Sequence, residues 1–337
     1  MKALLFTVVS SFALAGVLLA ADDGPRLEHF GYPFPVQMYR FNSQQQALEM
    51  AYMDLKPTGP EAGVIVLLHG KNFSGAYWEE TAQALAKGGY RVIMPDQIGF
   101  GKSTKPAHYQ FTFQQLANNT RDLLQSLKIS RVHVLSHSMG GMIAVRYALM
   151  FPAEVQSLVL EDPLGLEDWK AKGVPYTPVD QAYQQELTQT AEKIHAYQQE
   201  NYYGGKWDPR YDRWVDMLME FVRDPGYARM AWNQALASEM IYTQPVCYEF
   251  GSLRIPVLLI IGQRDRTAPG RNLVASQDVK AELGNYPRLG RVAAESIPNA
   301  KIVEIEGVGH IPHVEAFSKF IEPLLSYLKS GGSSTAL

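Results

Sequence analysis

Two residues with the chemistry of a nucleophilic site stand where apolar runs of this chain end. Ser138 follows the run 131–135, which contains β-branched residues, and His310 follows the strand-like stretch 301–305 in the loop 307–310. A serine hydroxyl becomes a nucleophile when a base takes its proton, and that base needs an acid to orient it. Strands that end at one edge of a sheet would bring the two side chains together. This placement indicates attack on a carbonyl, with Ser138 as nucleophile and His310 as base.

The other histidines fit the role of base less well. His313 lies three residues after His310 and would enter the last helix, whose apolar positions recur at helical spacing. His137 is adjacent to Ser138 but would point away from it. The remaining candidates lie in the leader of the mature chain, in loop or helical contexts, or within a strand: His29, His108, His195 and His133. We therefore predict His310 as the base.

Two aspartates are candidates for the orienting acid. Asp265 follows the apolar run 255–261, and Asp162 follows the run 157–161. Aspartate at a strand end often stabilises a loop through its own hydrogen bonds. The residues alone leave both aspartates open as the acid.

The stretch 131–152 must hold Ser138 in place, because it changes from strand to helix around this residue. Helical spacing of apolar residues begins at Met142 and ends before Pro152. A turn this sharp strains the serine backbone and brings a helix close to a strand, which the small residues Ser136, Gly140 and Gly141 permit. The hydroxyl of Ser138 is thereby predicted to stand at a helix N-terminus.

Strands and helices alternate around this stretch. Strands are expected at 35–41, 48–55, 64–68 and 91–94, and helices at 77–87 and from Thr112, where Thr112 and Gln115 form a capping box. The continuous apolar run 64–68 is typical of a strand buried on both faces. This alternation predicts an α/β fold with a mostly parallel, doubly wound sheet.

Three motifs occur in a consistent order along the chain: His69-Gly70 after the third strand, P-D-x-x-G-x-G-x-S at 95–103, and S-x-S-x-G at 136–140. Together they resemble the α/β-hydrolase superfamily, whose nucleophile elbow reads G-x-S-x-G. The resemblance covers 34–327. One departure is Ser136, which replaces the first glycine of the elbow. The tight turn then depends on serine being nearly as small as glycine.

The resemblance implies roles for particular residues. Met139 and Lys71, or less favourably Asn72, would supply backbone N–H groups for an oxyanion hole. Asp265 fits the G-x-x-D-R pattern of the family acid and is preferred to Asp162. His69 and Asp96 are interpreted as structural residues that tie down their loops.

The same resemblance implies a reaction class. A serine at the elbow argues against haloalkane dehalogenase and epoxide hydrolase chemistry, which in this fold uses an aspartate there. Hydrolysis of a carboxylic ester is the expected reaction, with lactone, amide or carbon–carbon bond cleavage as alternatives on the same triad. A hydrolase fold that only binds a ligand is the non-enzymatic alternative.

The segment 163–251 interrupts the strand rhythm and resembles the helical cap of the family. It holds four of the five tryptophans, and helices are expected around 180–201, 212–222 and 227–240. Trp207 and Tyr203 flank two glycines and precede a proline, a pattern that predicts a hinge. We predict that both aromatics contact an apolar or aromatic substrate.

Composition limits the other possibilities. The 337 residues carry a formal net charge of −3 and a pI near 6.3, so nucleic acid is not an expected partner. The single cysteine, Cys247, forms no internal disulfide, and no metal-binding motif is present. A small-molecule substrate without metal or cofactor is expected, and no oligomeric state is predicted.

The first residues have the order of a secretory signal. Met1 and Lys2 precede an uncharged stretch, 3–21, that ends in small residues. An uncleaved anchor of about 19 residues is the alternative, and cleavage after Ala20, Ala21 or 13–15 stays open. The signal predicts a periplasmic or secreted protein without stable membrane insertion after processing. The expected domain order is a signal peptide at 1–21, hydrolase core at 25–162, cap at 163–251, core again at 252–330 and a disordered tail at 331–337.

Overall fold

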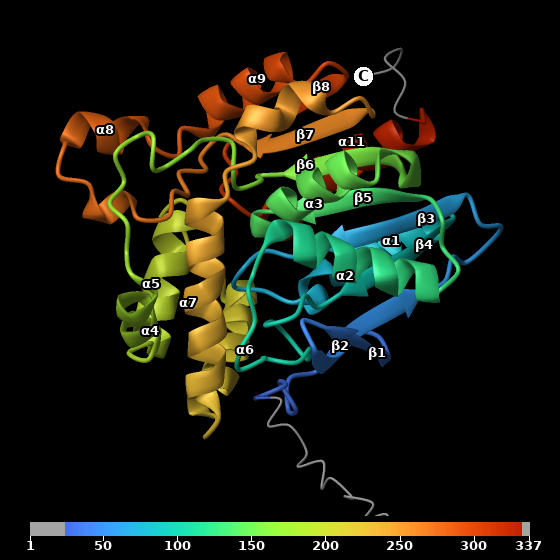
Figure 1. Ribbon diagram of the computed structural model, residues 1–337. Coiled ribbons are helices and arrows are strands. Elements are labelled where there is room, and N and C mark those ends of the chain that lie inside the picture. The colour runs from blue at the N-terminus through green and yellow to red at the C-terminus, as the bar shows by residue number, and fades with distance from the viewer. Residues whose placement is uncertain (1–23, 332–337) are drawn as a thin grey trace, which may run out of the picture.

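The computed structural model describes residues 24–331, whose centre is an eight-stranded sheet (Figure 1). The strands are Val36–Ser43 (β1), Gln46–Leu55 (β2), Gly63–Leu68 (β3), Tyr90–Pro95 (β4), Val132–His137 (β5), Val155–Glu161 (β6), Val257–Gly262 (β7) and Ala300–Ile305 (β8). Their order in the sheet is β1-β2-β4-β3-β5-β6-β7-β8. The pairs β1–β2 and β2–β4 are antiparallel, and every pair from β4 to β8 is parallel. The predicted α/β fold with a mostly parallel sheet is confirmed.

Helices cover both faces of this sheet. The helices outside the segment between β6 and β7 are Glu79–Lys87 (α1), Phe113–Ser126 (α2), Met139–Met150 (α3), Gln277–Glu282 (α8), Tyr286–Ser296 (α9), Pro312–Glu315 (α10) and Phe317–Lys329 (α11). Successive strand residues point to opposite faces, so Val66 belongs to a buried cluster shared with α2, α3 and α9, while Leu67 belongs to a cluster shared with α1 and α11. The parallel strands are therefore buried on both sides, as their continuous apolar runs require.

Helix α2 begins as its sequence predicts, with one difference. The Thr112 hydroxyl accepts a hydrogen bond from the Gln115 backbone N–H at 3.0 Å, which caps the helix. The Gln115 side chain bonds Asn119 Oδ1 at 2.9 Å and so stabilises the next turn. Only the threonine half of the predicted capping box is present.

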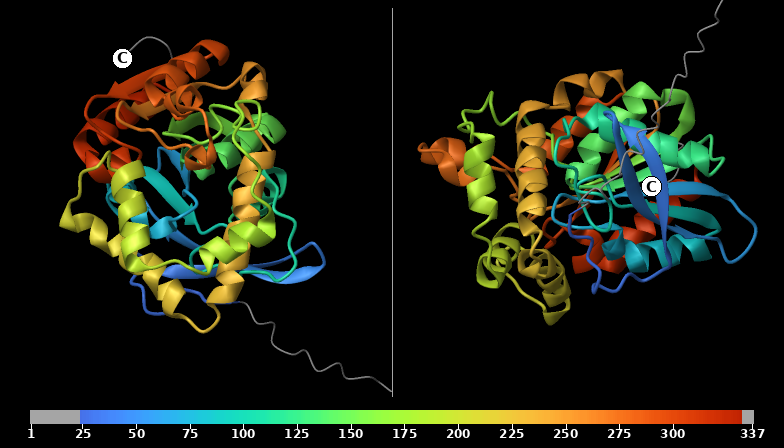
Figure 2. Two further views of the ribbon diagram at one scale, coloured as in Figure 1. Left: turned by 90° about the vertical axis from the view of Figure 1, so that its left-hand side faces the viewer. Right: turned by 60° about the horizontal axis from the view of Figure 1, so that its bottom comes forward.

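Between β6 and β7 lies a helical segment, which we call the insertion. Its helices are Val179–Glu186 (α4), Ala191–Asn201 (α5), Asp212–Arg223 (α6) and Tyr227–Thr243 (α7). They lie together at one side of the sheet, at the left of Figure 1, and stand in front of the strands in the left view of Figure 2. The stretch expected as one helical run at 180–201 is two helices, because Thr190 caps α5 by accepting from the Lys193 N–H at 3.3 Å. The insertion therefore folds beside the sheet without extending it.

The stretch between Gly270 and Gly284 contains a short helix. Ser276 accepts a hydrogen bond from the Val279 N–H at 3.3 Å and begins α8. The predicted signal at 1–21 and the tail from residue 332 lie outside the described residues. Among residues 24–331, no helix combines the length and the apolar character needed to cross a membrane.

His133 gives the fold a testable pH dependence. Its side chain in β5 is buried, and Nδ1 lies 2.8 Å from Ser157 Oγ. Burial, and then the charge of Arg131, lower the pKa of His133 to about 4. Between pH of about 6.5 and about 4, His133 is protonated in the unfolded chain but not in the folded chain. The free energy of unfolding therefore decreases as the pH is lowered through this window. We expect His133 to account for about 2–3 kcal/mol of the loss between pH 7 and pH 4.

Urea unfolding of wild type and His133→Asn at a series of pH values measures this contribution. The asparagine retains a polar partner for Ser157 but does not titrate. As the pH falls from 7 to 4, the free energy of unfolding of wild type should decrease relative to that of His133→Asn. A difference that stays constant with pH would show that His133 does not carry the effect.

Candidate active site

Ser138 occupies a strained turn between β5 and α3. Its backbone has φ 56° and ψ −123°, a region that non-glycine residues rarely adopt. Such strain persists only when the surrounding packing enforces it. The predicted backbone conformation of the serine is thus present, and its side chain stands at the N-terminus of α3.

Close packing around the turn enforces this conformation. A Cβ atom added to Gly140 would lie 2.3 Å from the Leu68 carbonyl oxygen, and one added to Gly141 would lie 2.4 Å from Pro163 Cβ. Ser136, which replaces the usual glycine, is buried in β5 and donates to the Val159 carbonyl at 3.1 Å. The hydroxyl of Ser136 is therefore satisfied inside the sheet, and the turn is kept.

Ser138, His310 and Asp265 form one hydrogen-bonded chain. His310 Nε2 lies 3.0 Å from Ser138 Oγ, and His310 Nδ1 lies 2.6 Å from Asp265 Oδ2. The other oxygen of Asp265 accepts from the Thr267 N–H at 2.7 Å. All three side chains are buried. The carboxylate orients the imidazole with Nδ1 as donor, which leaves Nε2 to accept the serine proton.

Backbone contacts on both sides hold His310. Its N–H donates to the Tyr202 carbonyl at 2.7 Å, and its own carbonyl accepts from His137 Nε2 at 2.7 Å. The ring of Tyr202 stacks on the His310 imidazole with centroids 5.1 Å apart. His137 points away from Ser138, as expected, and burial lowers its pKa well below the usual range. A neutral His137 and an insertion residue therefore position the loop that carries His310.

Asp162, the alternative acid, does not contact His310. Its carboxylate oxygens accept from the Gly262 N–H at 3.0 and 3.1 Å. Burial, followed by the charges of Asp265 and Glu161, raises the pKa of Asp162 well above its usual range. Asp162 thus stands next to Asp265 and fixes the strand end through the Gly262 N–H. Of the two sequence candidates, the structure brings only Asp265 to the histidine.

The other candidate residues serve as structural anchors. His313 Nδ1 lies 2.9 Å from both carboxylate oxygens of Glu161, which separates it from Ser138. His69 is buried and accepts from the Gln97 N–H at 2.9 Å. Asp96 accepts from the backbone N–H groups of Gly75 and Lys102, each at 2.7 Å. These contacts agree with the structural interpretation given to His69 and Asp96.

The loop after β3 lies directly against Ser138. A Cβ atom on Gly70 would be 3.1 Å from Ser138 Cβ, and the Gly70 N–H donates to the Tyr77 hydroxyl at 3.0 Å. Lys71 follows Gly70, and Met139 follows Ser138 as the first residue of α3. Both residues predicted for the oxyanion hole thus come from backbone segments that meet at Ser138. A helix N-terminus presents N–H groups that have no partner within the helix, which suits a developing negative charge.

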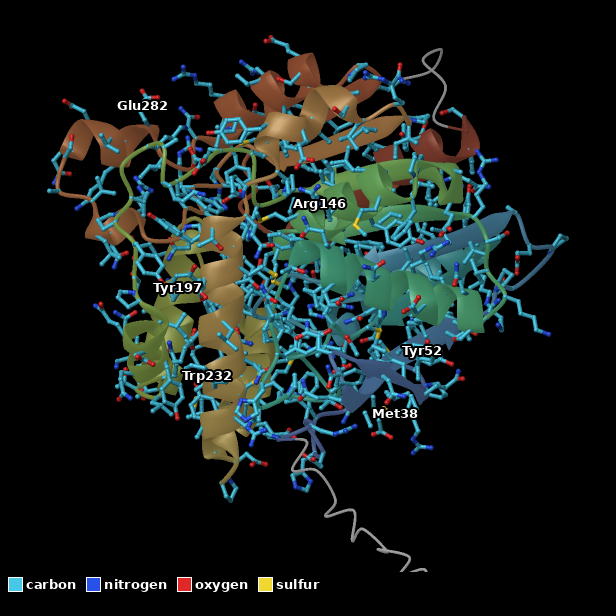
Figure 3. The ribbon with its side chains drawn as sticks, in the orientation of Figure 1. Met38, Tyr52, Arg146, Tyr197, Trp232 and Glu282 are labelled. Carbon is cyan, nitrogen blue, oxygen red and sulfur yellow. The ribbon has the colours of Figure 1, made fainter. Side chains whose placement is uncertain are left out.

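A cavity of about 470 Å³ opens from Ser138 into the insertion. Its walls include Lys71 and Asn72 from the loop after β3, and side chains from all four insertion helices. Asn72 Nδ2 donates to the Tyr202 hydroxyl at 2.8 Å. Tyr197 of α5, labelled in Figure 3, also lines the cavity and packs edge-on against Tyr202. The insertion therefore covers the hydroxyl of Ser138 and shapes the space in front of it.

Neither Trp207 nor Tyr203, the two aromatics predicted to contact substrate, lies among the cavity residues. Tyr203 is fully buried and stacks on Tyr211 with ring centroids 3.7 Å apart. The ring of Trp207 packs on that of His195 with centroids 3.9 Å apart, and Trp207 Nε1 donates to Asp212 Oδ1 at 2.8 Å. Tyr203 belongs to a buried core against which the partly buried Trp207 packs, and the residue that reaches the site is the neighbouring Tyr202.

The sequence analysis also missed the polar side chains of the cavity. Gln198 and Gln234 line it from α5 and α7. The sequence signal for these residues is a polar side chain within an otherwise apolar helical face. Assigning a residue to a face requires the first and last residues of the helix, which the sequence does not give. Within the described part of the chain, no group of three or more histidine, cysteine, aspartate or glutamate side chains has the arrangement of a metal site.

Comparison with known protein families and sequences bears on this site. A family model described as alpha/beta hydrolase fold matches residues 63–317. Lipase 1 of Psychrobacter immobilis is 27% identical over 258 residues, which cover 76% of this chain and 73% of the lipase. Lipase 3 of a Moraxella species is 28% identical over 255 residues, covering 75% and 73% of the two chains.

Solved structures show the same architecture. A probable hydrolytic enzyme from Pseudomonas aeruginosa has 51% sequence identity and a TM-score of 0.89, covering 90% of this chain and 97% of its own. A thermophilic esterase from Thermogutta terrifontis has 18% identity and a TM-score of 0.67, covering 88% of this chain and 100% of its own. The likeness to the Thermogutta terrifontis esterase, at 18% identity, concerns the fold alone.

Proposed function

Because the chain belongs to the α/β-hydrolase family and is a hydrolase, we propose that it cleaves carboxylic esters through an acyl-enzyme on Ser138. The observation that carries the proposal is the hydrogen-bonded chain from Ser138 Oγ through His310 to Asp265, with distances of 3.0 and 2.6 Å. Its position at the floor of a covered cavity supports a small-molecule substrate.

In the first half of the reaction, Ser138 Oγ attacks the ester carbonyl carbon while His310 Nε2 takes the hydroxyl proton. Asp265 stabilises the imidazolium that forms, since its carboxylate lies 2.6 Å from Nδ1. The carbonyl oxygen becomes negatively charged and is bound by the N–H groups of Met139 and Lys71. Each donor of this kind lowers the barrier by about 3–4 kcal/mol. Collapse of the intermediate breaks the bond to the alcohol oxygen, which receives the proton from His310.

In the second half, water replaces the alcohol. His310 Nε2 takes a proton from the water as the water oxygen attacks the acyl carbonyl, and a second oxyanion forms at the same N–H groups. Breaking the bond to Ser138 Oγ releases the carboxylic acid, and the proton returns to the serine. The lipase relatives favour an ester over the other bonds that such a triad cleaves.

Two measurements test the proposal together. A fluorophosphonate probe should label Ser138, because its reactive phosphorus accepts an activated serine, and peptide mapping should locate the label on this residue alone. The protein should also hydrolyse p-nitrophenyl esters, with a burst of p-nitrophenol when deacylation is slow. Ser138→Ala is the control for both. Absence of labelling in a folded protein would favour a ligand-binding role for the fold.

A further inference from the structure

The cavity wall is richer in neutral polar groups than an apolar substrate requires. Four glutamines line it: Gln185, Gln189, Gln198 and Gln234. Its charged side chains have partners, since Lys71 Nζ lies 3.0 Å from Glu186 Oε1 and Lys193 Nζ donates to the Thr188 carbonyl at 2.8 Å. A charged substrate group would have to compete with these partners. The lining therefore favours a neutral group that forms hydrogen bonds.

Gln198 is the central residue of this polar lining. Its side chain on α5 is only 1% exposed, and neither its amide nitrogen nor its amide oxygen has a hydrogen-bond partner within the protein. Buried amides are ordinarily paired, because an unpaired donor or acceptor in the interior is costly. An amide in the wall of a binding cavity meets this requirement when a ligand supplies both the donor and the acceptor.

Gln234 repeats the pattern from α7. It is 5% exposed, its amide oxygen has no protein partner, and its nitrogen reaches only the sulfur of Met230 at 4.0 Å. Asn72 contrasts with both glutamines, because its amide nitrogen donates to Tyr202. Two cavity amides on different helices thus retain unused hydrogen-bonding capacity.

Gln198 lies close to the reacting groups. Its carbonyl accepts from the Tyr202 N–H at 2.8 Å, so the two residues are about one helical turn apart, about 6 Å along the axis. The ring of Tyr202 stacks on His310. A substrate whose ester lies at Ser138 and whose chain runs into the insertion would pass this amide.

We propose that the part of the substrate covered by the insertion carries a neutral group that both donates and accepts hydrogen bonds, a carboxamide or a hydroxyl, and that Gln198 and Gln234 bind it. The inference rests on the proposed ester hydrolysis at Ser138 and adds the substrate class. A hydrocarbon chain in the same place would displace water without replacing its hydrogen bonds and would lose affinity.

Matched pairs of esters test the substrate class. In one series an acyl chain of fixed length contains either a secondary amide or methylene groups, and in a second series the same exchange is made in the alcohol. A hydroxyl-bearing ester is added to each series, so that the two polar groups are distinguished. We expect kcat/KM to be about tenfold higher for a polar member than for the hydrocarbon of equal length in at least one series. A hydrocarbon preference in both series would overturn the proposal.

Glutamine variants identify the residues. Gln198→Met and Gln234→Met keep the side-chain length and remove the amide, and each should lower kcat/KM much more for the polar esters than for the hydrocarbon esters, so that most of the polar advantage is lost. Gln199→Met is the matched control, since Gln199 neighbours Gln198 on α5 but does not line the cavity. Equal losses on polar and hydrocarbon esters would assign the glutamines a structural role and contradict the proposal.

Failure of the proposed function is recognised separately. Calorimetric titration of Ser138→Ala with the same esters measures binding without turnover. Tighter binding of the polar ester that is lost in Gln198→Met on this background supports the subsite even if no ester is hydrolysed. If hydrocarbon and polar esters bind equally well, the subsite is refuted while ester hydrolysis by wild type stands.

Discussion

Replacing Ser138 by alanine is expected to reduce kcat for ester hydrolysis by about ten-thousand-fold or more, with no loss of folded protein. The variant keeps the backbone turn but removes the serine oxygen that lies 3.0 Å from His310 Nε2. His310→Ala should cost a similar factor, because the serine then has no base. Steady-state hydrolysis of a p-nitrophenyl ester measures the effect, and a thermal melt of each variant confirms folding.

The losses of kcat caused by Ser138→Ala and His310→Ala should not add when the two substitutions are combined. Once the serine oxygen is gone, the histidine has no proton to accept, so Ser138→Ala combined with His310→Ala should be barely slower than Ser138→Ala alone. Multiplicative losses in the double variant would show that the two residues act independently, which the observed hydrogen bond does not allow.

The acid is tested by an isosteric pair. Asp265→Asn removes the charge beside His310 and favours the wrong imidazole tautomer, so a loss of about ten-thousand-fold is expected. Asp162→Asn is the matched control, because it makes the same exchange at the neighbouring strand end and its side chain can still accept from the Gly262 N–H. A larger loss for Asp162→Asn than for Asp265→Asn would move the acid to the end of β6.

Tyr203→Ala is expected to lower the unfolding free energy by about 3–5 kcal/mol. The ring is fully buried and stacks on Tyr211, so its removal leaves a cavity in the core of the insertion. Since Tyr203 does not line the substrate cavity, activity should fall by a similar factor for acetate esters and for long-chain esters. Urea unfolding and kcat/KM for the two esters measure both effects.

Two further variants separate the ring of Tyr203 from other causes. Its hydroxyl is buried without a protein partner, so Tyr203→Phe should be neutral or slightly stabilising. Tyr248→Ala removes a tyrosine that is 71% exposed and should change the unfolding free energy by less than about 0.5 kcal/mol. A selective loss on long-chain esters in Tyr203→Ala, without destabilisation, would restore this residue to the substrate site.

The sequence was sufficient to predict the sheet and the strained turn at Ser138 because both depend on local pattern. Continuous apolar runs such as that of β3 are required of strands buried on both faces. Ser138 could be found because a strand followed at once by a helix needs small residues, and those are visible as Gly140 and Gly141. His310 followed from its place after β8.

The remaining choices depend on side-chain direction, which a sequence does not show. Asp162 and Asp265 both follow parallel neighbouring strands, and only the loop after β6, with φ 35° at Asp162, turns the first carboxyl toward Gly262. Tyr202 and Tyr203 are consecutive at the end of α5, so one faces His310 and the other the insertion core. Choosing between them requires the end of that helix to within one residue.

The hydrogen bond from His310 to the Tyr202 carbonyl limits how this protein can be re-engineered. Gly309 is packed so closely that an added Cβ would lie 2.2 Å from the same carbonyl oxygen. A chimera that exchanges the whole insertion for that of another hydrolase would remove the acceptor of the His310 N–H and leave the loop without its support. Grafts that alter substrate range should therefore retain the end of α5 and the following loop, and vary α4, α6 and α7, whose exchange leaves the His310 backbone contact in place.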